Sequence, residues 1–71
     1  MKVEKDFEII VDWLVKNVGP VIKDDWTTLI GEGWFVTVGT DYNPKGNFVK
    51  DYWLVEIGDK KKEILFALIF G

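Results

Sequence analysis

The chain has 71 residues, a formal net charge of −3, and a composition that is 48% hydrophobic and 15% aromatic. This length predicts a single domain over residues 1–71, and the aromatic content argues against intrinsic disorder. Arg, His, Ser, Gln and Cys are absent, which excludes Ser-His-Asp and Cys-His nucleophiles, disulfides and zinc sites built from His and Cys.

Residues 4–18 are predicted to form an amphipathic helix. Asp6 can cap its start or lie in its first turn, while Gly19 permits a left-handed cap and Pro20 cannot continue the helix. The apolar stripe that supports this prediction consists of Val3, Phe7, Ile10, Val11, Leu14 and Val18.

Two apolar residues of this helix, Ile9 and Trp13, lie off the stripe and are four residues apart. One interpretation is that they widen the buried surface or pack beneath the loop at residues 20–30. The other is that they form part of a contact surface for another chain.

The rest of the chain is predicted to be mainly β-structure. Residues 26–30 read as a short strand or a packed loop, and strands are expected at 33–42, 47–57 and 62–70. The turns "NPKGN" and "GDKK" between them are short, so neighbouring strands should run antiparallel. The predicted fold is therefore α+β: one N-terminal helix packed on a three-stranded meander, or a four-stranded one, in the order α-β-β-β.

The expected register pairs Tyr42 with Asn47 and Ile57 with Lys62. One sheet face then collects apolar residues from Trp34 to Phe70 and is expected to pack against the helix. Asp51 is the one charge on that face: either an acid with a raised pKa, or a sign that the register is off or that the carboxylate pairs at the rim. The opposite face would carry a continuous apolar patch made of Phe35, Tyr52, Leu54, Leu65, Ala67 and Ile69.

No catalytic constellation is visible, so we expect no enzyme, no cofactor and no metal site. The four Thr residues have no recognisable base beside them, no run of alternating oxygen ligands suits calcium, and the glycines around Gly31 lead into a strand, unlike a phosphate-binding loop. The charged start of the chain is unlike a signal peptide, and the last apolar run is too short to span a bilayer. A cytoplasmic protein is the expectation.

The segment "VEIGDKKKEIL", following a helix and "GWFVTV", resembles the PepSY and cystatin-like group of small α+β domains. In that group a strand leads into a turn of the form I-D-x-x-x-G-x-I-L; here the usual glycine is replaced by Lys62 or Glu63. The resemblance implies a helix packed on an antiparallel sheet and a binding or inhibitory role towards other proteins. It carries over no catalytic residues.

One helix cannot cover both faces of the sheet, so another protein chain is expected on the second face. The first hypothesis is a non-enzymatic protein-binding module, an inhibitor or accessory protein. The alternative is a homodimer that uses the same face or pairs its last strands edge to edge. A second alternative is single-stranded nucleic-acid binding, with Phe35 and Tyr52 stacking beside Lys50, which the net negative charge disfavours. The expected partner-binding residues are Trp13, Phe35, Tyr52, Leu54, Leu65 and Ile69.

Overall fold

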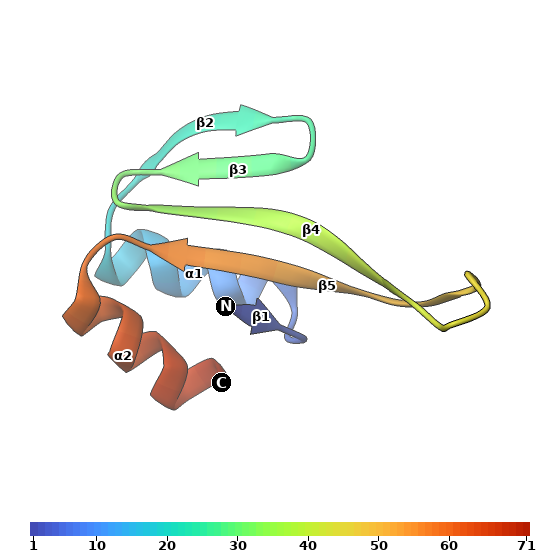
Figure 1. Cartoon of the computed structure of the whole chain (residues 1–71). Helices are drawn as coiled ribbons and strands as arrows, with labels where there is room; N and C mark the ends of the chain where they lie inside the picture. Colours follow the sequence, from blue (N-terminus) through green and yellow to red (C-terminus); the bar gives the residue numbers. More distant parts are fainter.

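The computed structural model describes all 71 residues and contains two helices and a five-stranded antiparallel sheet (Figure 1). Along the sheet the strands follow the order β1-β5-β4-β3-β2. The predicted order α-β-β-β with three or four strands is therefore wrong. The elements in chain order are β1 (Lys2–Val3), α1 (Phe7–Asn17), β2 (Val21–Asp25), β3 (Thr28–Gly31), β4 (Trp34–Tyr42), β5 (Phe48–Ile57) and α2 (Lys60–Phe70).

Helix α1 is the predicted N-terminal helix, shortened at its start. The Asp6 carboxylate caps it by accepting a hydrogen bond from the Glu8 N–H at 2.9 Å. The preceding residues are extended because Val3 pairs with β5 opposite Trp53 and is buried there. Gly19 is not a left-handed cap, since the only glycines with positive φ are Gly33 and Gly46.

The stretch 20–33 forms a second hairpin, β2–β3, on the outer side of β4. Strand β3 covers most of the predicted segment 26–30, and Trp26 lies in the turn that joins it to β2. Gly31 packs against the Trp34 ring, whose indole N–H donates to the Gly19 carbonyl at 2.8 Å. The hairpin is thereby anchored to the end of α1.

The hairpin β4–β5 confirms the predicted alternation but not the predicted register. Val36 lies opposite Val55, where the prediction placed Trp53, because the turn is longer and the register shifts between Asp41 and Tyr42. The displacement is two residues from Trp34 to Asp41, so the side chains of this part of the hairpin keep their predicted faces. The predicted "NPKGN" turn is present, with the Gly46 N–H donating to the Asn43 carbonyl at 2.9 Å.

Residues 62–70, predicted to be the last strand, belong to helix α2, so the pairing of Ile57 with Lys62 is also wrong. Asp59 caps this helix, and its carboxylate accepts hydrogen bonds from the N–H groups of Lys61 at 2.9 Å and Lys62 at 3.2 Å. An apolar run with neither a 2-residue nor a 3.6-residue period does not distinguish a strand from a helix. Seven of its eleven residues are good helix formers: three Lys, one Glu, two Leu and one Ala.

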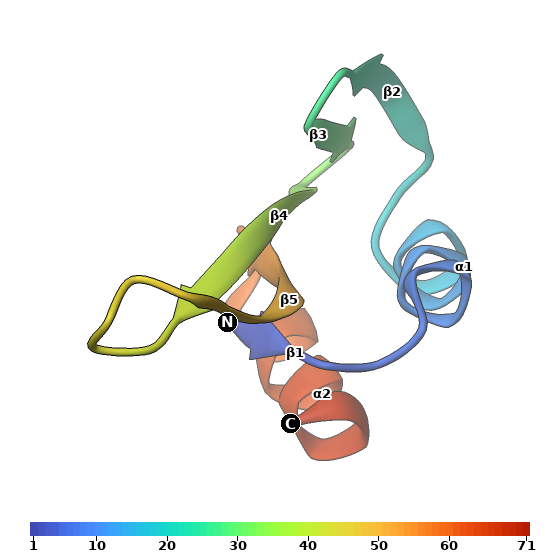
Figure 2. The ribbon, with the colours of Figure 1, turned by 90° about the vertical axis from the view of Figure 1, so that its right-hand side faces the viewer.

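Both helices pack on the same face of the sheet, and no element covers the other face (Figure 2). Trp13 of α1 lies edge-on to two rings of α2, with centroids 5.5 Å from Phe66 and 6.2 Å from Phe70. Trp13 is therefore a contact between the helices. The buried core consists of Val3, Ile10, Leu14, Trp34, Val36, Val55, Ile57 and Phe66.

The far ends of β4 and β5 continue beyond the other strands as a two-stranded arm (Figure 1). Tyr42 and Phe48, opposite one another near its tip, are both exposed. Asp51 also lies on this arm, where it is exposed and accepts a hydrogen bond from the Thr40 hydroxyl at 3.0 Å. Of the interpretations given for Asp51, the geometry favours a shifted register and a carboxylate paired at the rim over an acid enclosed in the core, because the helices do not extend over this end of the sheet.

Candidate functional site

The sheet face that no helix covers is called the outer sheet face. Phe35 lies directly opposite Ile30 on β3, and Thr37 lies opposite Leu54 on β5. At one end of the face, Ile30 and Phe35 border a shallow hollow of about 380 Å³, with Glu56 at its edge. The middle of the face consists of Thr28, Ile30, Phe35, Thr37, Gly39, Tyr52 and Leu54, and charged residues surround it: Lys2, Lys23, Asp25, Asp41, Lys50 and Glu56.

Tyr52 lies flat across Gly39, the residue opposite it in β4. A Cβ at position 39 would come within 2.4 Å of the Tyr52 ring, so this arrangement requires glycine. The Lys2 ammonium lies 4.3 Å from the centroid of the same ring and donates a hydrogen bond to Asp41 at 2.6 Å. Tyr52 therefore contacts the backbone at Gly39 on one side and a lysine that is paired with Asp41 on another.

The two lysines near Tyr52 are both paired with carboxylates. The hydrogen bond to Asp41 raises the pKa of Lys2, and the hydrogen bond from Lys50 lowers the pKa of Glu4. Each contact neutralises a cation that a phosphate backbone would need. The nucleic-acid hypothesis, which used Lys50 as its phosphate contact, gains no support from this geometry.

Leu65 and Ile69 lie on helix α2 and not beside Phe35 and Leu54 in the sheet. The single continuous patch predicted for these residues is thus divided between two elements. The two residues belong instead to an apolar surface, here called the α2 stripe, which points away from the core. The α2 stripe consists of Ile64, Leu65, Leu68 and Ile69, and each of these side chains is exposed.

The α2 stripe is contiguous because its members are spaced four residues apart in two rows: Ile64 with Leu68, and Leu65 with Ile69. Leu68, the most exposed member, has 79% of its surface accessible. A helix that is apolar on all sides is normally buried on all sides. In α2 only Phe66 is fully buried.

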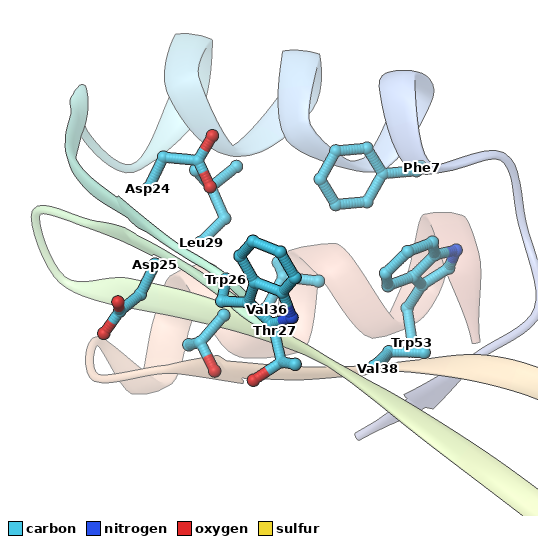
Figure 3. A pocket seen from close by; sticks show the side chains of 10 residues that line it. Phe7, Asp24, Asp25, Trp26, Thr27, Leu29, Val36, Val38 and Trp53 are labelled. Carbon is cyan, nitrogen blue, oxygen red and sulfur yellow. The ribbon is translucent and has the colours of Figure 1, made fainter.

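A cleft of about 290 Å³ lies between α1 and the sheet, on the helix-covered side near the β2–β3 turn (Figure 3). Its apolar lining is formed by Leu29, Val36 and Val38, while Phe7 and Trp53 pack together at one end with ring centroids 4.5 Å apart. Its remaining lining residues are Asp24, Asp25, Trp26, Thr27 and Thr28.

Trp26 is the least expected part of this cleft. It lies in the turn of the β2–β3 hairpin, where 99% of its surface is exposed. Its ring nevertheless lies at the side of the cleft (Figure 3). Sequence reasoning assigned it to a strand or a packed loop. The signal for a turn here is the pair Asp24–Asp25, because Asp is common in turns.

No three carboxylates come together closely enough to hold a metal ion. Neither helix is both long and apolar enough to cross a membrane. The surfaces described above are the outer sheet face, the α2 stripe and one cleft whose lining combines aromatic, aliphatic and acidic groups.

Comparison with known proteins gives no relative from which a function could be transferred, and the resemblance to PepSY and cystatin-like domains stays a prediction. No protein-family model matches the chain, and no curated protein or solved structure matches it.

Proposed function

We propose that this chain is a small, cytoplasmic, non-enzymatic protein-binding module, and that the α2 stripe is its main interface. The observation that carries the proposal is the exposure of Ile64, Leu65, Leu68 and Ile69 on a helix with no polar residue after Glu63. Together they present on the order of 400 Å² of apolar surface, about as large as the largest patch on a typical monomer.

The molecule is less compact than a typical monomer of its size. Its accessible surface is 5017 Å², against about 4,500 Å² for a compact monomer of this mass. Its radius of gyration is 12.8 Å, against about 11 Å for a compact chain of this length. Both differences describe an elongated molecule with a projecting arm, which exposes more surface than a compact monomer of its size.

The outer sheet face offers a second contact area on the same module. Phe35, Tyr52 and Leu54 supply large side chains there, and the hollow beside Phe35 could receive an apolar residue of the partner. Aromatic anchors of this kind account for much of the binding energy in protein interfaces.

A homodimer is the second candidate, and the distribution of charge on α2 favours it. Lys60, Lys61 and Lys62 occupy the N-terminal turn, whereas the C-terminal turn carries no charged side chain. Two copies of α2 packed antiparallel would place these cations at the negative end of each other's helix dipole. The α2 stripes would meet in the same arrangement.

Sedimentation equilibrium of the wild type, Leu68→Glu and Ile9→Glu tests the proposal. Ile9 is the matched control, since it is an apolar residue on the outside of α1 with 58% of its surface exposed. For a homodimer we expect the wild type and Ile9→Glu to exceed 8.2 kDa with rising concentration, while Leu68→Glu stays monomeric. For a different partner we expect three monomers, with binding to that partner lost only in Leu68→Glu.

Thermal unfolding of each variant confirms that any loss of association is not a loss of folding. If Leu68→Glu associates and binds as the wild type does, the α2 stripe is not an interface and the proposed function fails.

A further inference from the structure

We propose that the cleft between α1 and the β2–β3 hairpin binds a small organic cation, an ammonium group that carries apolar substituents. The inference is independent of the α2 stripe, which lies on another element. It rests on the combination of an aliphatic lining, aromatic rings and one unpaired carboxylate in a cleft that no lysine lines.

The aliphatic and aromatic groups define the kind of ligand. Leu29, Val36 and Val38 offer no hydrogen-bonding side chain, so the part of the ligand in contact with them must be apolar. The rings of Phe7 and Trp53 line the cleft at one end, and the ring of Trp26 lines it from the β2–β3 hairpin. Aromatic rings arranged around an apolar space attract alkylated ammonium groups through their quadrupoles.

Asp24 supplies the negative charge. It pairs in the sheet with Leu29, so its side chain lies on the helix-covered side of β2, and Figure 3 shows its carboxylate directed towards α1 and the cleft. No hydrogen bond or ion pair engages it. Asp25, the next residue, points to the opposite side and lies 3.9 Å from the Lys23 ammonium.

Trp26 provides a means of closing the cleft. Its 99% exposure means that its ring has almost no contacts to lose when it moves onto a ligand. A bound apolar cation would give that ring its first packing partner. The cleft volume of about 290 Å³ limits the ligand to a small molecule.

The experiment is an NMR titration with choline and with its uncharged isostere 3,3-dimethyl-1-butanol, the latter in sodium chloride of equal ionic strength. The probe is the Trp26 indole N–H signal, assigned by its absence in Trp26→Ala. We expect choline to shift this signal in a saturable manner, with an affinity at least about tenfold higher than that of the alcohol.

The variants Asp24→Asn and Asp25→Asn are matched in charge and are adjacent in sequence. We expect Asp24→Asn to weaken choline binding at least about threefold and to leave the weak binding of the alcohol unchanged. Asp25→Asn should bind choline within twofold of the wild type. Trp26→Ala, followed through the Trp53 indole signal, should weaken choline binding at least about threefold and remain folded.

Equal affinities for choline and the alcohol would show that the positive charge contributes nothing to binding, and would overturn the inference. So would equal effects of the two Asp variants, since Asp24 would then act only through the overall charge. No saturable shift at ~50 mM choline, an affinity too weak for a built site, would overturn it as well.

Discussion

Gly31 shows most directly how one residue determines the local packing. A Cβ at this position would lie 1.9 Å from the Trp34 ring, which is buried and hydrogen-bonded to the Gly19 carbonyl. Because that ring is held from both sides, it has no room to move away from an added methyl group.

We therefore expect Gly31→Ala to lower the free energy of unfolding by about 1–3 kcal/mol, as measured by urea denaturation. Gly39→Ala is the matched control. Its Cβ would also meet a ring, that of Tyr52, but this ring lies on the outer sheet face and can rotate towards solvent. A loss for Gly39→Ala as large as that for Gly31→Ala would contradict this explanation.

The ion pair between Glu4 and Lys50 predicts a pH dependence. The hydrogen bond from Lys50 lowers the pKa of Glu4 in the folded protein. The pair should therefore stabilise the fold above the unfolded-state pKa of Glu4, and this contribution should be lost as the pH falls through the lower, folded-state pKa. Both side chains are about half exposed, so solvent screens the effect.

NMR titration of the wild type and Lys50→Gln measures this directly. We expect the pKa of Glu4 to lie below its ordinary value in the wild type and to return towards it in Lys50→Gln. Lys45→Gln, which changes the net charge equally in the nearby turn, should leave the pKa of Glu4 unchanged. An identical Glu4 pKa in all three proteins would show that the pair does not form.

Among the secondary-structure elements, α2 depends most on a single side chain. Phe66 is fully buried, stacks on Phe70 at 4.6 Å and contacts Trp13, whereas Leu68 on the opposite side of the helix is almost free. We expect Phe66→Ala to cost about 3–5 kcal/mol and Leu68→Ala well under 1 kcal/mol in the monomer.

Thermal and urea unfolding at a concentration where the protein is monomeric would test this contrast. For a small domain, the loss expected for Phe66→Ala is a large part of the total stability, so the variant should be partly unfolded at 25 °C. If both variants unfold at the same midpoint, α2 is not held by Phe66.

The sequence predicted some elements and not others for identifiable physical reasons. Alternation marks β4, clear turn signals bound β5 on both sides, and Asp6 with its following stripe marks α1, so these elements could be predicted. Strand β1 has two residues, too few for any period. Helix α2 has apolar residues on all sides, so its seven-residue apolar run matched a buried strand as well as a helix; the Asp59 cap and the helix-forming composition were the signals for a helix.

The candidate sites follow the same division. Phe35, Tyr52 and Leu54 were assigned to the correct sheet face because a period of two survives an even error in register. The exposure of Leu65, Ile69 and Trp13 could not be predicted in this way. It depends on where the last element packs, which is a property of the tertiary structure. The cleft could not be predicted, because it needs α1 and the β2–β3 hairpin, whose strands were unclear in the sequence.

For the molecule as a whole, the two helices on one side of the sheet explain both the small core and the large apolar surface. Eight buried hydrophobic residues support the fold, while fifteen large hydrophobic residues are exposed. Association, which the sedimentation experiment measures, would add the contacts that the single chain lacks. Without it, the stability of the fold would depend mainly on those eight residues.

The edge strand β2 also affects how copies of the protein meet at high concentration. The unpaired backbone N–H and C=O groups of an open edge can pair with strands of other copies, and repeated addition of this kind forms fibrils. Here the edge carries Lys23, Asp24 and Asp25 in succession, and charged side chains on an edge strand disfavour the addition of another strand. The charges on β2 therefore oppose open-ended growth of the sheet from this side.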